Sequence, residues 1–145
     1  LEACLLDSLK KRVNFLEETF ALLKLENITA IHGRAEEFAK NKAYREQYDL
    51  CVSRAVSNLA TLSEYCLPYV KVGGNFISYK SGTVQEELQQ AEKAVKILGG
   101  KIQDVVYFNL PDSEIQRSLV VIEKMKPTPG RYPRKAGTPL KEPLS

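Results

Sequence analysis

Residues 1–32 read LEACLLDSLKKRVNFLEETFALLKLENITAIH. The apolar run over 1–6 predicts a buried strand, and Asp7 and Ser8 are residue types that favour the start of a helix. Between residues 9 and 23, apolar side chains recur at intervals of three and four, which predicts an amphipathic helix. A second apolar stretch, 28–31, predicts another strand. The chain therefore opens as strand, helix and strand, the order typical of neighbouring parallel strands.

The same alternation continues along the chain. The predicted elements are a short helix within 33–38, a strand at 48–53, a helix at 58–70, a strand at 75–79, a helix at 84–98 and two strands at 101–110 and 118–126. The strand at 48–53 is apolar enough to be central in a sheet, and Gly73 and Gly74 predict a turn. The short link between the last two strands suits an antiparallel pair. We expect an α/β, Rossmann-like fold with a mostly parallel sheet, an antiparallel final hairpin and ligands at the carboxyl ends of the strands.

The C-terminal residues differ from the rest in charge and proline content. Residues 126–145 hold five basic side chains and one acidic one, a net charge of +4, whereas the whole chain carries +3. Five of the seven prolines lie in the same stretch, so neither regular helix nor sheet is expected there. We divide the chain into a folded domain, 1–126, and a basic, proline-rich tail, 127–145.

The composition disfavours several classes of site. Charged residues make up 27% of the chain, and no apolar run approaches the ~20 residues that cross a bilayer, so a soluble, cytoplasmic protein without a membrane partner is expected. Cys4, Cys51 and Cys66 are odd in number and widely spaced, which disfavours a disulfide framework or a zinc site. With His32 as the single histidine, no metal cofactor is expected. Neither a Gly-x-Gly-x-x-Gly motif, a phosphate-binding loop nor a nucleophile with its base is present, which disfavours hydrolase chemistry.

Three candidate binding positions follow predicted strands. Asp7 either accepts hydrogen bonds from ribose hydroxyls or caps the next helix. The stretch 33–37, GRAEE, either lets an adenine ring approach, with Glu36 accepting a hydrogen bond, or simply starts a helix. Arg54 can pair with a carboxylate or phosphate, although a chance charge at a strand end is the plain alternative. We expect these groups to converge on one pocket at one edge of the sheet.

The tail offers a candidate surface for nucleic acid. Arg131, Arg134 and Lys135 are interleaved with Tyr132 and with prolines, a composition suited to phosphate contacts and base stacking. A solvated run of charges is the alternative.

Five motifs in order resemble the RsmG family, also called glucose-inhibited division protein B, which methylates the N7 of one guanine in small-subunit rRNA. They are DSLKKRVNFL (7–16), GRAEE (33–37), SRAV (53–56), YCLP (65–68) with the glycine pair 73–74, and YPRKAG (132–137). The resemblance implies a class I methyltransferase fold with S-adenosyl-L-methionine as cofactor. It also implies that Ala35, Glu36 and Arg54 lie in the cofactor site, with Asp7 at the ribose.

The resemblance also implies an RNA partner and a longer family protein of which this chain is a part. Arg134 and Lys135 match a basic tail that would meet ribosomal RNA or the small ribosomal subunit. The family's glycine-rich loop, the strand before it and the N-terminal helices lie upstream of the position of Leu1, which opens on an apolar stretch without a methionine. We therefore expect a C-terminal fragment or processed product that lacks the first strand of the sheet and binds the cofactor weakly by itself.

The chemistry requires little from the protein. The N7 of guanine has a lone pair and no proton, so methyl transfer needs placement but no general base, and no catalytic residue is assigned. Two alternatives remain open. The chain could be a noncatalytic RNA-binding module, or another nucleotide-dependent α/β enzyme such as a dehydrogenase.

Overall fold

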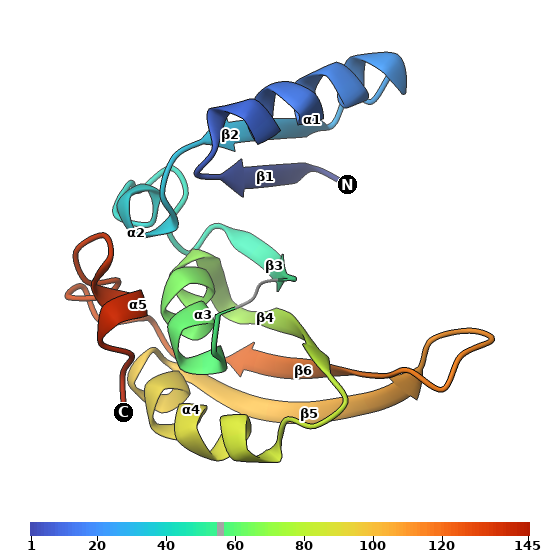
Figure 1. Cartoon of the computed structure of the whole chain (residues 1–145). Helices are drawn as coiled ribbons and strands as arrows, with labels where there is room; N and C mark the ends of the chain where they lie inside the picture. Colours follow the sequence, from blue (N-terminus) through green and yellow to red (C-terminus); the bar gives the residue numbers. More distant parts are fainter. Residues whose placement is uncertain (55–56) are drawn as a thin grey trace.

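The computed structural model describes residues 1–54 and 57–145, which form two separate β-sheets (Figure 1). The first sheet pairs β1 (Ala3–Asp7) and β2 (Ile28–His32) in parallel, with α1 (Lys10–Leu22) as the connection. The register places Asp7 beside His32 at the carboxyl end of both strands. This unit is the strand–helix–strand predicted from residues 1–32.

The second sheet has four strands and contains most of the core. In spatial order its strands are β3 (Tyr48–Ser53), β4 (Val70–Ser81), β6 (Gln116–Lys124) and β5 (Gly100–Asn109). β3 and β4 are parallel, whereas β6 is antiparallel to both of its neighbours. The predicted α/β class with an antiparallel final hairpin is confirmed. The predicted central position of β3 is wrong, because β3 is an edge strand whose Leu50 and Val52 are 51% and 56% exposed.

The glycine pair lies inside β4, so the predicted turn at Gly73 and Gly74 is wrong. Tyr48 pairs with Val70 but Leu50 pairs with Asn75, and β4 therefore bulges between these two pairings. Gly73 adopts a left-handed φ of +91°, and a Cβ on Gly74 would lie 2.6 Å from the Asp49 carbonyl oxygen. The glycines allow an irregular strand to continue where a turn was expected.

Two helices cover one face of the four-stranded sheet. α3 (Leu59–Cys66) begins after Asn58, whose side chain accepts a hydrogen bond from the Thr61 amide at 2.9 Å, and α4 (Gln85–Ile97) packs beside it. The predicted helix at 58–70 ends early, since a short 3-10 turn that contains Pro68 follows α3. The apolar core between helices and sheet is formed by Leu59, Leu62, Leu67, Val70, Phe76, Ala91, Val95, Leu98, Val120 and Ile122.

The first sheet contributes little to this core. Val13 is the one buried residue of α1, while Leu9 and Leu23, at the two ends of the predicted stripe, are 49% and 63% exposed. The predicted apolar stripe therefore packs only in part, because a two-stranded sheet offers a narrow surface. Among the described residues there is no helix with the length and hydrophobicity that a membrane span requires.

The tail packs against the rest of the molecule and includes a short helix, α5 (Thr138–Lys141), so the expectation of no regular structure is wrong. Pro139 lies in the first turn of α5, where its missing amide hydrogen leaves no helical bond unmade. The Thr61 hydroxyl donates to the Pro139 carbonyl at 2.9 Å, which ties α5 to α3. The division at residue 126 stays a prediction.

Candidate functional site

Asp7 lies at the carboxyl end of β1, as predicted, and fixes the turn into α1. Its Oδ1 accepts a hydrogen bond from the Leu9 amide at 2.9 Å, and its Oδ2 lies 3.6 Å from Nη1 of Arg12. The Asp7 carbonyl also accepts a hydrogen bond from the Gly33 amide at 3.0 Å. The hydrogen bond to the Leu9 amide, just before α1 begins, resembles the helix-capping role that was the alternative for Asp7. A role at a ribose stays a prediction.

Ala35 and Glu36 begin α2 (Ala35–Phe38) after β2, and their polar groups already have partners. The Ala35 carbonyl accepts a hydrogen bond from the Tyr69 hydroxyl at 2.6 Å. Oε2 of Glu36, a residue only 3% exposed, accepts from the Gly137 amide at 2.9 Å and from Nη2 of Arg34 at 3.3 Å. The carboxylate of Glu36 thus holds the tail in this structure.

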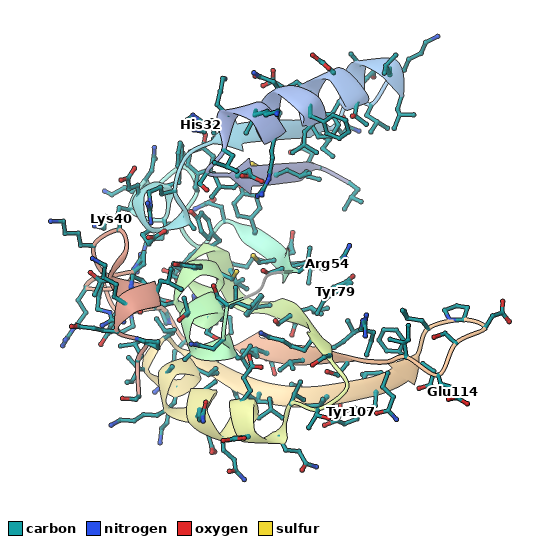
Figure 2. The ribbon with its side chains drawn as sticks, in the orientation of Figure 1. His32, Lys40, Arg54, Tyr79, Tyr107 and Glu114 are labelled. Atoms are coloured by element: carbon teal, nitrogen blue, oxygen red, sulfur yellow. The ribbon has the colours of Figure 1, made fainter. Side chains whose placement is uncertain are left out.

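Arg54 follows β3 and is exposed. Ser53 pairs with Ser78, so Arg54 lies near Tyr79, two residues before the end of β4, and both side chains lie on the same side in Figure 2. An exposed guanidinium at this edge can bind a carboxylate or a phosphate through paired hydrogen bonds. The last two residues of the SRAV motif, 55 and 56, lie outside the described residues.

The structure does not bring the three positions together, so the expected single pocket is wrong for this chain. Ala35 contacts Tyr69, just before β4 begins, whereas Arg54 lies beyond the far end of β3. Six residues of strand at about 3.3 Å each separate these two ends by roughly 20 Å. In Figure 1 the arrow of β1 points toward α2, while the arrow of β3 points away from it.

The reason for this separation is the pairing of the strands. In residues 1–54 and 57–145, β1 pairs only with β2, and β3 pairs only with β4. Within these ranges, hydrogen-bonded ladders do not fix the direction of β1 against β3, and the contacts of Ala35 and Glu36 place the first sheet instead. The residues present therefore do not surround S-adenosylmethionine in this arrangement.

A cavity of about 370 Å³ lies between the first sheet and the start of β3. Tyr44 and Tyr48 line it together with Glu2, Cys4 and Glu26. Burial, and then the neighbouring thiol of Cys4, raise the pKa of Tyr48 to about 12. The charged groups of this lining are carboxylates, so the cavity does not suit an anionic ligand.

The predicted RNA-binding residues of the tail divide into two kinds. Arg131, over the ring of Tyr132 at 5.2 Å, and Lys135 are exposed. Arg134 instead places Nη2 2.8 Å from Oε1 of Glu64 and Nε 3.1 Å from Oε2, and Glu64 is completely buried. This pairing raises the pKa of the Arg134 guanidinium. Arg134 anchors the tail, which is a different role from the predicted contact with RNA.

Arg45 is a second tail anchor, and it was missed in the sequence. Its Nη1 donates to the Tyr132 carbonyl at 2.8 Å, and its Nη2 donates to the carbonyls of Thr128 and Pro129 at 3.0 and 3.1 Å. These partners lie more than 80 residues away along the chain, so no local pattern could have indicated them.

Two lysines with structural partners were also missed. Lys124 is fully buried and donates to the carbonyls of Leu67 and Val70 at 2.7 and 2.9 Å, and burial lowers its pKa. Lys124 continues the alternation of buried residues along β6, and this alternation could have indicated its burial from the sequence. Lys80 donates to the Ser57 carbonyl and pairs with Glu87, each at 2.7 Å, and so connects β4 to Ser57 and to α4.

The sequence matches the family model described as GidB, rRNA small subunit methyltransferase G, over residues 1–120. The chain belongs to this family. It is 56% identical over 144 residues to ribosomal RNA small subunit methyltransferase G of Lachnoclostridium phytofermentans, covering 99% of this chain and 60% of the relative. The corresponding protein of Clostridium tetani is 52% identical over 143 residues with the same coverage. The chain thus spans about 60% of the length of these curated relatives.

Solved structures share the fold at low sequence identity. NSun6 from Pyrococcus horikoshii with SFG gives a TM-score of 0.65 at 15% identity, covering 86% of this chain and 42% of that chain. M. jannaschii TYW2 in complex with AdoMet gives 0.63 at 12% identity, covering 86% and 58%. The likeness supports a class I methyltransferase-like fold and, at this identity, nothing further.

Proposed function

We propose that this chain is the C-terminal part of an S-adenosylmethionine-dependent methyltransferase that acts on the N7 of a guanine in small-subunit (16S) ribosomal RNA. The observation that carries the proposal is the 56% identity over 144 residues to a curated rRNA small subunit methyltransferase G. The five ordered motifs support the same assignment. A ribosomal substrate is consistent with a cytoplasmic location, which we propose as well.

The edges of β1 and β3 that have no paired strand in the described residues support a split site. We propose that a strand from the part of the protein outside this chain pairs with both β1 and β3. In the described residues β3 pairs with β4 alone, so its other edge is available for such a neighbour. In a parallel sheet the ends of β1, β2 and β3 would share one edge, so that Asp7, Ala35 and Arg54 would lie together. The chain by itself should then bind S-adenosylmethionine weakly or not at all.

The test is methyl transfer by the full-length gene product. The purified protein is incubated with S-adenosylmethionine carrying a labelled methyl group and with naked small-subunit rRNA or its particle. We expect label at the N7 of one guanine, a strong loss of transfer in Arg54→Ala, and partial retention in Arg54→Lys, which keeps the charge without the forked donors. A correctly folded full-length protein that transfers no methyl group to that RNA would contradict the proposal.

A second candidate function is a noncatalytic RNA-binding module. The exposure of Arg131 and Lys135, together with the separation of Arg54 from Ala35, favours this role for the chain alone. Salt-dependent RNA binding that disappears when residues 126–145 are deleted, without cofactor binding, would support it. Calorimetry with S-adenosylmethionine and NAD side by side tests the dehydrogenase alternative. Of the three functions, this one has the least support, because the chain belongs to a methyltransferase family.

A further inference from the structure

Two basic segments that are far apart in the sequence lie side by side on the surface. Nη1 of Arg45 donates to the Ala39 carbonyl at 3.2 Å and to the Tyr132 carbonyl at 2.8 Å. Ala39 precedes Lys40, and Tyr132 follows Arg131. A single nitrogen atom therefore holds together the main chain beside these two cations.

A second link joins the same segments a few residues further along. Oε2 of Glu36 accepts hydrogen bonds both from the Gly137 amide at 2.9 Å and from Nη2 of Arg34 at 3.3 Å. Arg34 is thereby placed beside the main chain that carries Lys135. Two independent polar contacts thus fix segment 34–42 against segment 131–137.

The exposed charges of these segments are almost all positive. Glu36 is buried and Arg134 is paired with Glu64, so neither contributes a free charge at the surface. What remains exposed is Glu37 and five cations: Arg34, Lys40, Lys42, Arg131 and Lys135. Within the described ranges, the ion pairs include none of the last four cations. Figure 2 shows Lys40 extending into solvent next to the tail.

We propose that Arg34, Lys40, Lys42, Arg131 and Lys135 form one basic face that binds the phosphate backbone of RNA. The inference rests on the proposed function, since it takes ribosomal RNA as the substrate. Arg34 shares its charge with Glu36, whereas the other four cations are outside the ion pairs of the described residues. Such cations, carried on a main chain that buried contacts hold in place, can meet successive phosphates with little ordering cost. The face would position the RNA without reading its sequence.

The experiment measures RNA affinity against salt with the full-length protein and a fluorescent small-subunit rRNA transcript. Two double variants, K40A/K42A and R131A/K135A, remove one pair of cations from each segment. The matched control, K93A/K96A, removes two exposed lysines from α4, away from the basic face. Each pair should reduce the slope of log affinity against log salt by about 1.4, from roughly 0.7 per phosphate contact, and the two pairs together by about 3.

The outcomes separate this inference from the proposed function. Slopes reduced by both pairs and not by the control, with unchanged thermal midpoints, support the basic face. An effect confined to the tail pair, or an equal effect in K93A/K96A, overturns it. If the wild-type protein methylates the RNA while all variants bind as tightly as wild type, only the basic face fails. If the face variants lose RNA binding but the wild-type protein transfers no methyl group, only the methyltransferase assignment fails.

Discussion

Replacement of Arg134 by alanine should lower the free energy of unfolding strongly. The guanidinium of Arg134 is the main partner of the buried carboxylate of Glu64 and anchors the tail. Glu64 is completely buried and accepts hydrogen bonds from Nε and Nη2 of Arg134 and from the Arg134 main-chain amide, the last at 2.7 Å. Nη2 also donates to the Glu142 carbonyl at 2.6 Å. In R134A the carboxylate keeps the main-chain donor alone.

The size of this loss of stability follows from the hydrogen-bond donors that Glu64 keeps in R134A. Breaking a buried ion pair by removing one partner typically costs 3–5 kcal/mol, because an uncompensated charge is left in a dry environment. Arg134 is 24% exposed and one donor to Glu64 survives, so the lower end, about 3 kcal/mol, applies. Arg134→Lys keeps the charge but not the forked geometry and should cost about half as much. Glu64→Gln removes the buried charge, and its effect should not add to that of R134A.

Urea unfolding followed by circular dichroism measures these differences in the free energy of unfolding. Arg131→Ala is the matched control, since Arg131 is an exposed arginine three residues away whose loss should change stability by less than about 0.5 kcal/mol. Equal stabilities of R134A and R131A would refute the anchor role of Arg134. The predicted contact of Arg134 with RNA would then again be the simpler interpretation.

Three further predictions concern groups that the structure reveals. Arg45→Ala removes the donor to three tail carbonyls and should cost about 2 kcal/mol, with faster proteolysis of residues 127–145 than in wild type; an unchanged cleavage rate would contradict this. The pKa of Tyr48, raised from 10.0 to about 12, means that the unfolded chain loses this proton first, so stability should be complete below pH 10 and fall toward pH 12. Tyr48→Phe should remove that part of the alkaline loss, and an identical pH profile would show that Tyr48 does not titrate this way. Lys80→Met should lower methyl transfer by the full-length protein, because Lys80 holds the carbonyl of Ser57, which is three residues from Arg54 in the sequence. Lys71→Met, at the other end of β4, should leave methyl transfer unchanged; equal effects of the two variants would exclude this role for Lys80.

Much of the local structure was predictable from the sequence because it follows from apolar periodicity. The strand at 48–53 has the predicted bounds, and the other main helices and strands shift by a few residues. Gly73 and Gly74 were misinterpreted because glycines that end a strand and glycines that form a bulge within one look alike in a sequence. Pro139 was misinterpreted because proline is excluded from the interior of a helix but not from its first turn.

The candidate site was predictable only as a set of positions. Asp7 ends a strand, and Ala35 and Arg54 follow strands, as expected. Their convergence would require the strand that we propose to pair with both β1 and β3. The partner of Arg134 lies 70 residues away, and its burial could not be known from the charge pattern of the tail. Side chains that connect distant segments, such as those of Arg45 and Glu64, leave no periodic signal.

Calorimetric titration of S-adenosylmethionine into two proteins, the 145-residue chain and the full-length gene product, tests the split site most directly. We expect heat of binding with the full-length protein and none with the chain, because only the former would bring Arg54 to the same edge as Ala35. Micromolar binding by the chain alone would show that a complete site exists without a bridging strand, and would contradict the account.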